Sequence, residues 1–228
     1  EAFDIYGGSQ DLIFPHHENE IAQSTCALGQ DAFAKYWVHN GYLMSEGEKM
    51  SKSLGNFYTV HELLKVFPGE AIRLVLLQTH YRQPLDFSKT SISEAKRTLD
   101  RWYRMVRNIK GELRVPECVT AALCDDINTP QAIAELHKCA RTGDTKGFLA
   151  GARFLGLMKQ DPEEWFKWRP TGSRGNNLDD AAIEALIAER SDAREGKKFG
   201  RSDAIRDDLA TQGIILEDGP KGTTWRRS

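Results

Sequence analysis

The spacing of apolar residues changes near residue 88, and this change constrains the fold more than any other feature of the sequence. Over residues 1–88, short apolar runs alternate with turn residues and short helical stretches, which is typical of an α/β region. Further on, Leu99, Trp102 and Val106 open an apolar stripe with the spacing of a helix. The sequence therefore predicts an α/β region followed by an α-helical bundle.

Caps and helix breakers give the expected boundaries. Asn128 or Thr129 can cap a helix with Pro130 in its first turn, and Gly213 can end the last helix. Residues 159–177 are rich in Pro, Gly and Asn, so we expect a linker there. The expected helices cover 15–28, 59–67, 70–80, 91–113, 128–141, 179–195 and 202–212, and a hairpin covers 214–227. The predicted domains are 1–88, 89–172 and 173–228, the last being a small α+β tail.

The composition is that of a soluble cytoplasmic protein. Of the 228 residues, 40% are hydrophobic and 28% are charged, with a formal net charge of −2. No run approaches the roughly 18 apolar residues of a membrane-spanning helix, so we expect no membrane partner. Four cysteines, Cys26, Cys118, Cys124 and Cys139, lack the spacing of a disulfide framework or a Cys-x-x-Cys motif, which favours reduced thiols.

The stretch GEKMSKSLGN, residues 47–56, indicates a phosphate-binding loop. Lys49 and Lys52 lie three residues apart between glycines, so they can neutralise phosphates while Ser51 and Ser53 add hydroxyl donors. Phosphoryl and adenylyl transfers depend on such positioning and charge stabilisation. From the residues alone, an ordinary solvated surface loop is the alternative.

The stretch FPHHENEIAQS, residues 14–24, indicates a metal-binding helix. If Pro15 starts the helix, His16 and Glu20 lie four residues apart on one face, where an imidazole and a carboxylate can bind one Zn²⁺. An ordinary polar pair, worth about 0.3 kcal/mol, is the alternative. Zinc normally takes four ligands, and the sequence offers no convincing further pair.

A basic stretch, AREGKKFGRSDAIR, occupies residues 193–206. Its cations and Phe199 suit contact with nucleic-acid phosphates and stacking on a base. A solvated helix face is the alternative. Trp225, further along the same tail, is expected in the tail's hydrophobic core.

Five motifs occur in the order in which the cysteinyl-tRNA synthetase family has them. They are GGSQDLIFPHHENEIAQS, EKMSKSLGNF, HYRQPLDFS, DDINTP and LEDGPKGTTWRR. The chain therefore resembles this family of class I aminoacyl-tRNA synthetases over nearly its whole length. The resemblance implies the C-terminal part of a Rossmann-like catalytic domain, a DALR-like tRNA-binding bundle and an anticodon-binding tail.

The resemblance also implies how the substrates are held. The family's KMSKS loop holds ATP, with Mg²⁺, while cysteine is activated. Lys49, Ser51, Lys52 and Ser53 are therefore expected to bind ATP, and the two lysines to stabilise its phosphates during catalysis. Asp11 matches a family position that can hold the ammonium group of cysteine; a carboxylate that caps a turn or helix is the alternative.

In the family, His16 and Glu20 would share a zinc ion with two cysteines from an earlier part of the chain. That zinc receives the thiolate of the substrate, which serine and valine cannot offer, so those analogues are rejected without editing. One position departs from the family pattern. Tyr6 stands where the family has a histidine beside the bound cysteine, which makes Tyr6 an expected substrate contact of altered chemistry.

By the same resemblance, the tail reads the anticodon GCA of tRNA(Cys). Arg194, Asp203 and Asp218 are expected to read base edges, because arginine suits guanine acceptors and carboxylates suit amino groups. Phe199 is expected to stack on an unpaired base.

The chain begins at Glu1, and none of its six histidines forms the His-x-Gly-His element of the class. We therefore expect the C-terminal portion of a longer, monomeric cysteine–tRNA ligase that is inactive alone. Two alternatives remain open. One is the related ligase that joins cysteine to an amino sugar in mycothiol synthesis, which has no use for an anticodon-binding tail. The other is a non-catalytic tRNA-binding protein.

Overall fold

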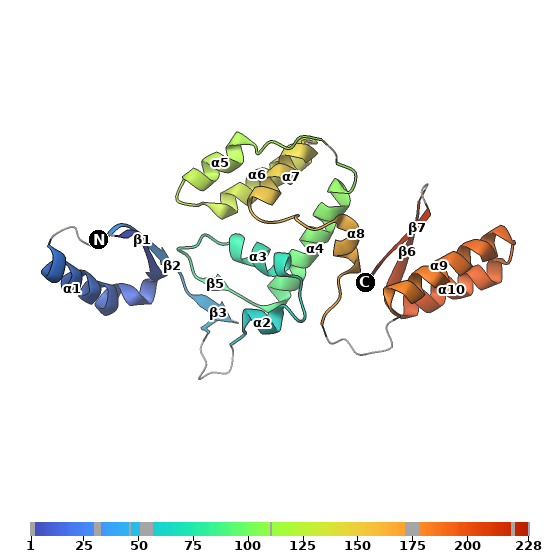
Figure 1. Cartoon of the computed structure of the whole chain (residues 1–228), viewed down its shortest axis with the longest axis horizontal. Coiled ribbons are helices and arrows are strands. Elements are labelled where there is room, and N and C mark those ends of the chain that lie inside the picture. Colours follow the sequence, from blue (N-terminus) through green and yellow to red (C-terminus); the bar gives the residue numbers. More distant parts are fainter. Residues whose placement is uncertain are drawn as a thin grey trace. The chain divides into compact units, whose positions relative to one another are not determined.

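Figure 1 shows the computed structural model of the chain, which describes residues 3–29, 33–45, 47–50, 57–109, 111–171, 178–219 and 222–227. The chain divides into two compact units. The first comprises Glu1–Thr59 and Gly69–Lys159, and the second comprises Val60–Pro68 and Gln160–Ser228. We describe each unit by itself. Within the described ranges, no helix combines the length and the apolar character needed to cross a membrane.

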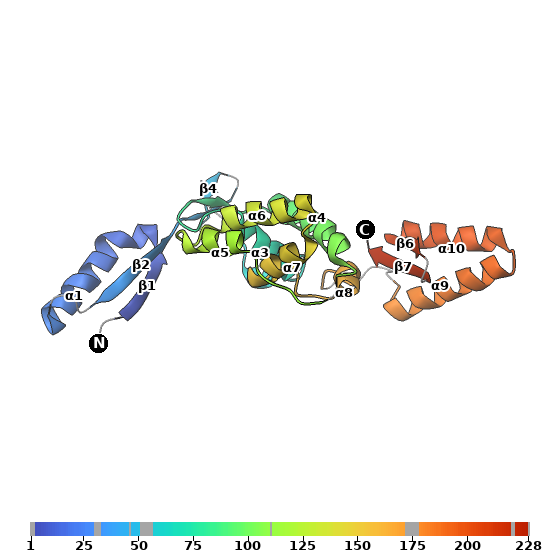
Figure 2. The same cartoon turned by 90° about the horizontal axis from the view of Figure 1, so that it is seen from above.

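The first unit begins with a β-α-β element. Strand β1 (Phe3–Ser9) pairs in parallel with β2 (Ala34–Asn40), and helix α1 (Glu18–Leu28) connects them and runs along them in Figures 1 and 2. Two parallel strands need such a crossover because both run in the same direction. Helix α1 ends at Gly29, whose φ of 97° is readily adopted only by glycine. The α/β start of the chain is confirmed.

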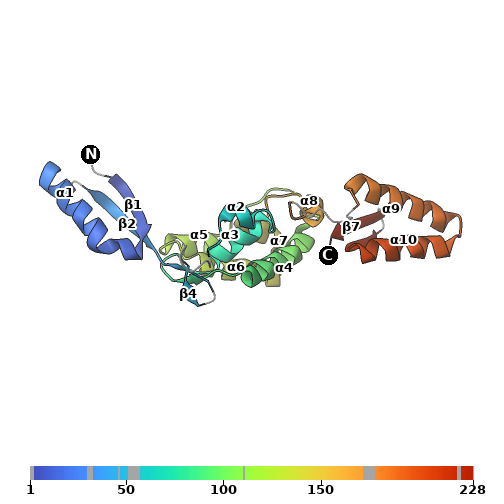
Figure 3. The same ribbon diagram turned by 90° about the horizontal axis from the view of Figure 1, so that it is seen from below.

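A second small sheet lies at the start of the predicted phosphate-binding loop. Strand β3 (Leu43–Ser45) lies between β4 (Glu48–Lys49), which is antiparallel to it, and β5 (Leu85–Asp86), which is parallel to it. In this strand order β4, which is labelled in Figures 2 and 3, is an edge strand. The loop therefore starts from an ordered strand pair.

The described remainder of the first unit is helical. Helices α3 and α4 pack on each other, as do α5 and α6, and α6 and α7. Leu99 and Phe148 are fully buried, and the ring of Trp102 meets that of Phe148 edge-on at 5.2 Å. The predicted bundle and two members of its apolar stripe are thus confirmed. The bounds are α3 (Gly69–Leu77), α4 (Lys89–Val106), α5 (Glu117–Cys124), α6 (Thr129–Thr142) and α7 (Thr145–Phe154).

Helix α4 is shifted from the predicted range 91–113. Ser88 starts it early, because its Oγ accepts a hydrogen bond from the N–H of Ser91 at 3.1 Å while the Ser91 Oγ accepts from the N–H of Ser88 at 3.1 Å. Beyond the helix, Gly111 has a φ of 103°, which a helix does not contain. Leu113 therefore lies outside the helix that it was predicted to extend.

The second unit contains the small α+β tail. Helices α9 (Asp180–Glu195) and α10 (Phe199–Thr211) pack on each other, and α10 packs on β6 (Ile214–Gly219), which forms an antiparallel hairpin with β7 (Gly222–Arg227). The predicted hairpin and the core position of Trp225 are confirmed. The buried residues of this core are Ile183, Ile205, Leu209, Ile214 and Trp225.

The predicted linker 159–177 contains a helix, so that prediction is wrong over part of its length. Helix α8 (Pro162–Lys167) starts after Asp161, whose carboxylate accepts a hydrogen bond from the N–H of Glu163 at 2.8 Å. Trp165 and Phe166 on this helix are buried. The stretch 159–177 thus contains two buried aromatic side chains, which the prediction of a linker did not anticipate. Residues 172–177 of this stretch lie outside the described part of the chain. The second unit also contains the short helix α2 (Val60–Leu63).

Candidate functional site

The predicted metal-binding pair lies at the start of α1. A turn over Ile13–His17 leads into the helix, and His16 Nε2 lies 3.4 Å from Glu20 Oε1. Two ligands bound at about 2.0–2.1 Å to one tetrahedral zinc lie about 3.4 Å apart, so this pair fits two corners of a zinc site. Within the described ranges, no group of three or more His, Cys, Asp or Glu side chains is placed to hold a metal ion.

Tyr6 reaches this pair from the neighbouring strand. Its hydroxyl donates a hydrogen bond of 2.5 Å to Glu20 Oε2, and this bond raises the pKa of Tyr6. The two oxygens of Glu20 therefore face different partners, Oε1 facing His16 and Oε2 facing Tyr6. The structure thus brings Tyr6, His16 and Glu20 together.

A cluster of rings that the sequence analysis missed lies beside Tyr6. His17 is buried, and its Nδ1 lies 3.0 Å from Nε2 of His39. Trp37 stacks on His39, with ring centroids 5.7 Å apart, and its ring centroid lies 5.0 Å from that of Tyr6. Burial, followed by the neighbouring His17 and Arg82, lowers the pKa of His39. The rings of His17, Trp37 and His39 therefore form one cluster beside Tyr6.

One signal for this cluster was present in the sequence. Trp37 and His39 are two apart on a strand, so their side chains point to the same face. The strand pairing sets Trp37 opposite Tyr6. A Cβ at Gly8 would overlap the ring of His17, so a glycine is needed at that position.

Asp11 lies in a single turn of 3₁₀ helix, Gln10–Leu12, at the carboxyl end of β1. Ligands of parallel α/β sheets bind outside the carboxyl ends of the strands. Gln10, beside Asp11, donates a hydrogen bond from Nε2 to the backbone oxygen of Arg82 at 2.8 Å. The turn that carries Asp11 is thus fixed to a second segment of the first unit.

The predicted ATP-binding residues are described only in part. Lys49 ends β4, where it pairs with Met44 of β3. Ser51, Lys52 and Ser53 lie outside the described residues, and so does the side chain of Lys49.

In the tail, Asp218 is held by its own chain. Both of its oxygens accept hydrogen bonds of 2.9 Å from the buried Arg190, and Oδ1 accepts a further bond from Thr223 at 2.7 Å. These bonds hold the pKa of Asp218 well below its ordinary value. Arg194 Nη1 lies 3.3 Å from Oδ2. Arg190, which the sequence analysis missed, is therefore the principal partner of Asp218.

The other predicted tail residues lie at the surface. Phe199, the first residue of α10, is 61% exposed, and Asp203 is exposed on the same helix. Arg194, in the last turn of α9, has a half-exposed side chain. A large exposed aromatic ring beside cations suits contact with an unpaired base.

Three family models match this chain in succession. The "tRNA synthetases class I (C) catalytic domain" matches residues 1–97, the "DALR domain" matches 119–143 and the "Cysteinyl-tRNA ligase anticodon binding domain" matches 179–226. The chain is also 52% identical, over its whole length, to a protein of Rhodospirillum rubrum named cysteine–tRNA ligase. The chain belongs to the cysteinyl-tRNA synthetase family. The predicted family and fold class are therefore confirmed.

Other comparisons agree with this membership. A cysteine–tRNA ligase of Rhodospirillum centenum is 55% identical over 99% of this chain. The chain covers 52% of each of these two proteins, so it spans about half the length of the curated relatives that it matches. A solved ternary complex, "Agrobacterium radiobacter K84 agnB2 LeuRS-tRNA-LeuAMS", matches 71% of this chain and 26% of that chain, with a TM-score of 0.53 and 19% identity, which shows a likeness of fold.

Proposed function

We propose that this chain forms part of a cysteine–tRNA ligase, which activates cysteine with ATP and transfers it to tRNA(Cys). The observation that carries the proposal is the 52% and 55% identity to two cysteine–tRNA ligases over 99–100% of this chain. The proposed compartment is the cytoplasm and the proposed assembly is a monomer. The division into domains 1–88, 89–172 and 173–228 is retained as part of this proposal.

The proposed reaction has two steps. The carboxylate of cysteine attacks the α-phosphorus of ATP, the bond to the bridging oxygen breaks, and cysteinyl-adenylate and pyrophosphate form. A hydroxyl of the terminal ribose of the tRNA then attacks the carbonyl carbon, loses its proton and displaces AMP. Lys49 and Lys52, with Ser51 and Ser53, are proposed to hold the ATP–Mg²⁺ and to stabilise the charge that develops on the departing pyrophosphate.

The proposed amino-acid site lies around the carboxyl end of β1. His16 and Glu20 are proposed zinc ligands, which their 3.4 Å separation supports. A bound zinc would supply a soft Lewis acid that prefers a thiolate to a hydroxyl. Asp11 is proposed to pair with the ammonium group of cysteine. Tyr6 orients the Glu20 carboxylate through its hydroxyl.

The proposed anticodon surface comprises Arg194, Phe199 and Asp203, whose exposure in the tail supports the role. Guanidinium and carboxylate groups can read the edges of unstacked bases, and an aromatic ring can stack on one. Because the oxygens of Asp218 accept from Arg190 and Thr223, we propose that Asp218 acts on the anticodon through Arg194.

The first test is cysteine-dependent exchange between ATP and pyrophosphate. It is run with this chain alone and with the N-terminal half of the Rhodospirillum rubrum relative added as a separate polypeptide. We expect only background exchange from the chain alone, because its sequence contains no His-x-Gly-His element, and measurable exchange after the addition. The exposed side chains of Phe3, Ile5 and Tyr36 support this design, because parallel sheets are normally covered on both faces.

Two variants assign the roles within the assembled protein. Lys52→Ala should abolish exchange while cysteine still binds, whereas the exposed control Lys138→Ala should not change either property. His16→Ala should remove zinc, measured by metal analysis, whereas the control His61→Ala should retain it. Wild-type exchange in Lys52→Ala, or full zinc content in His16→Ala, would contradict the assigned role. Binding of tRNA(Cys) without exchange in either mixture would favour the non-catalytic alternative.

A further inference from the structure

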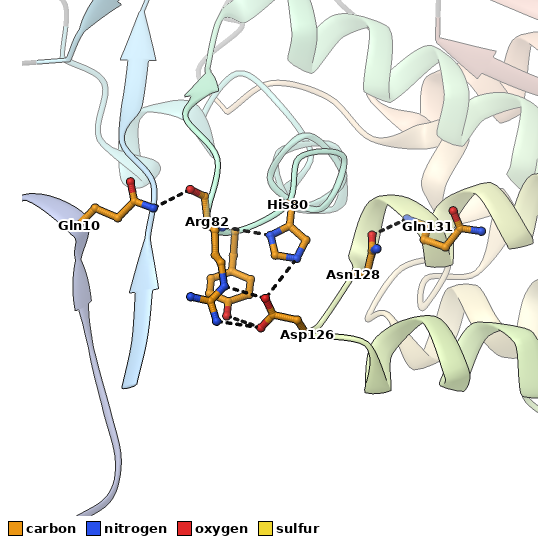
Figure 4. Close-up of polar contacts among 7 residues, drawn as sticks. Gln10, His80, Arg82, Asp126, Asn128 and Gln131 are labelled. Atoms are coloured by element: carbon orange, nitrogen blue, oxygen red, sulfur yellow. Dashed lines mark hydrogen bonds and ion pairs between the residues drawn. The ribbon is translucent and has the colours of Figure 1, made fainter. Parts of the chain in front are cut away.

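A cluster of polar side chains in the first unit joins the turn between α5 and α6 to the segment between α3 and β5 (Figure 4). Asp126 Oδ1 accepts a hydrogen bond from the Tyr81 hydroxyl at 2.7 Å and another from Arg82 Nη2 at 3.1 Å. Asp126 Oδ2 accepts from Arg82 Nε at 2.7 Å and lies 3.9 Å from Nε2 of His80. A forked contact between carboxylate and guanidinium is among the stronger and more directional polar contacts. We call these four residues the Asp126 clamp.

The backbone of the α5–α6 turn holds Asp126 in an unusual conformation. Asp126 has a φ of 51° and Ile127 a φ of 56°, both in the left-handed region. Aspartate tolerates that region, but a β-branched isoleucine is strongly disfavoured there. Next in the chain, Asn128 caps α6 by accepting from the N–H of Gln131 at 3.1 Å (Figure 4). The turn is therefore fixed by the helix that follows it, and it presents Asp126 to the segment 80–82.

The other side of segment 80–82 contacts the proposed amino-acid site. The backbone oxygen of Arg82 accepts from Nε2 of Gln10 at 2.8 Å, next to Asp11 (Figure 4). The backbone oxygen of Tyr81 accepts from the N–H of Gly41 at 2.7 Å, immediately after β2. The same short segment thus contacts the chain just beyond the carboxyl ends of both strands of the parallel sheet.

We propose that Asp126 is a positioning residue for the turn that carries Asp11. Its carboxylate fixes Tyr81 and Arg82, and the Arg82 carbonyl in turn fixes Gln10 and therefore the turn Gln10–Leu12. The helical bundle thereby acts on the proposed site through a continuous series of contacts, without touching the substrate. The part of this inference that concerns cysteine rests on the proposed function, because it requires Asp11 to hold the ammonium group.

The test measures amide hydrogen exchange on the full 228-residue chain at neutral pH. Two amides report on the strand ends: the N–H of Ile13, which donates to the Gln10 oxygen, and the N–H of Gly41, which donates to the Tyr81 oxygen. We expect Asp126→Asn to speed exchange at both amides about threefold, the size expected for a half-exposed ion pair. Asp125→Asn, an identical change of charge at the exposed neighbouring residue, should leave both rates unchanged.

A double-variant cycle tests whether the contacts act in series. Gln10→Ala should speed exchange at Ile13 about as much as Asp126→Asn does, and the double variant should exceed neither, because both changes break the same connection. Faster exchange of Gly41 with an unchanged rate at Ile13 in Asp126→Asn would overturn the proposal, since Asp126 would then stabilise only its own segment. Arg82→Gln, which removes the forked contact from the other side, provides the same comparison if Asp126→Asn does not fold.

The activity of the assembled enzyme separates this inference from the proposed function. We expect Asp126→Asn to raise the KM for cysteine about threefold in the exchange assay and to leave the KM for ATP unchanged. An unchanged KM for cysteine, together with faster exchange at Ile13, would overturn the role assigned to Asp11 and uphold the clamp. An unchanged exchange rate at Ile13 would overturn the clamp whatever the enzyme does.

Discussion

Tyr6 stands where the family's pattern has a histidine, and its hydroxyl bonds to Glu20. A histidine there would carry a shorter side chain and a titratable ring. The tyrosine hydroxyl donates to one oxygen of the carboxylate and leaves the other facing His16. Such a partner normally fixes the orientation of a metal-binding carboxylate and so affects metal affinity. We therefore expect the Tyr6 hydroxyl to affect zinc binding through Glu20, which can be measured.

We expect Tyr6→Phe to weaken zinc binding to the assembled protein about tenfold, because the ring stays but the donor to Glu20 is lost. Competition with a chromogenic chelator measures the affinity. The matched control is Tyr36→Phe, which removes a hydroxyl from an exposed ring on β2 and should not change the affinity. An affinity for zinc that is the same in Tyr6→Phe and in wild type would show that the hydroxyl does not orient Glu20.

At Ile127 we predict that a substitution raises the stability of the chain. Its φ of 56° costs a β-branched residue about 1–2 kcal/mol, and its side chain is 51% exposed, so little apolar burial offsets that cost. We expect Ile127→Asn to raise the free energy of unfolding by about 1 kcal/mol, because asparagine tolerates the left-handed region. Urea unfolding measures the change. Leu76→Asn, at a similarly exposed position inside α3, should lower stability, and a loss in both variants would refute the strain at Ile127.

At the scale of the elements, a buried carboxylate joins three segments of the first unit. Glu70, in the first turn of α3, accepts from the Tyr103 hydroxyl on α4 at 2.9 Å. It also accepts from the N–H groups of Met158 at 2.9 Å and Lys159 at 3.0 Å. Because the carboxylate is buried, its removal leaves these donors without their acceptor.

We therefore expect Glu70→Ala to lower the free energy of unfolding by about 3 kcal/mol, and Tyr103→Phe, which removes one of the donors, to lower it by about 1 kcal/mol. Urea unfolding of both variants measures these values. Glu117→Ala, at an exposed position in the first turn of α5, is the matched control and should change stability by less than about 0.5 kcal/mol. A loss for Glu70→Ala no larger than that of the control would contradict the role of this carboxylate.

The elements that sequence reasoning predicted are those with local signals. The cap at Asn128 and Pro130 in the first turn marked the start of α6, and the turn residues GPKG marked the final hairpin. Helix α7 was not predicted because Gly147 and Gly151 lower its helix propensity. A Cβ at Gly151 would overlap the side chain of Leu136, so packing on α6 requires that glycine. The contact that explains this glycine is thus with a residue on another helix, which local sequence signals do not reveal.

In the candidate site too, the contacts between residues close in sequence were predictable and the contacts between separate elements were not. The spacing of His16 and Glu20 was sufficient to bring their side chains together, although the prediction that Pro15 starts the helix was wrong: His16 lies in the turn Ile13–His17, and α1 begins at Glu18. The bond from Tyr6 to Glu20, and the contact between His17 and His39, depend on how strands and helix pack. Arg190 was missed because its neighbour Arg194 gave the same basic signal and burial is not visible in a sequence.

At the scale of the whole molecule, each unit contains a carboxyl group whose pKa is lowered by an arginine partner. In the first unit, the bonds from Arg82 and Tyr81 lower the pKa of Asp126 to about 2. In the second, the bonds from Arg190 and Thr223 hold the pKa of Asp218 well below its ordinary value. A group with a lowered pKa in the folded state stabilises that state above its unfolded pKa, near 4, and loses this contribution as the pH falls toward the folded pKa. Both units should therefore lose stability between about pH 5 and pH 2.

Asp218→Asn tests this dependence in the second unit. Arg190 is buried and would lose its charged partner, so we expect the variant to be less stable at pH 7. Because 47% of the Asp218 side chain is exposed and solvent screens the pair, the loss should be about 1 kcal/mol. At pH 2 the difference between the variant and wild type should be smaller, because this carboxyl group is protonated in the unfolded wild-type chain at that pH and its ionisation then contributes less to stability. The reporter in urea unfolding is the indole N–H of Trp225, which donates to Glu184 at 2.7 Å.

The control is Asp207→Asn, at an exposed position on α10, which should show the acid dependence of the wild type. If the loss of stability in Asp218→Asn is equal at pH 7 and pH 2, ionisation of Asp218 does not stabilise the second unit.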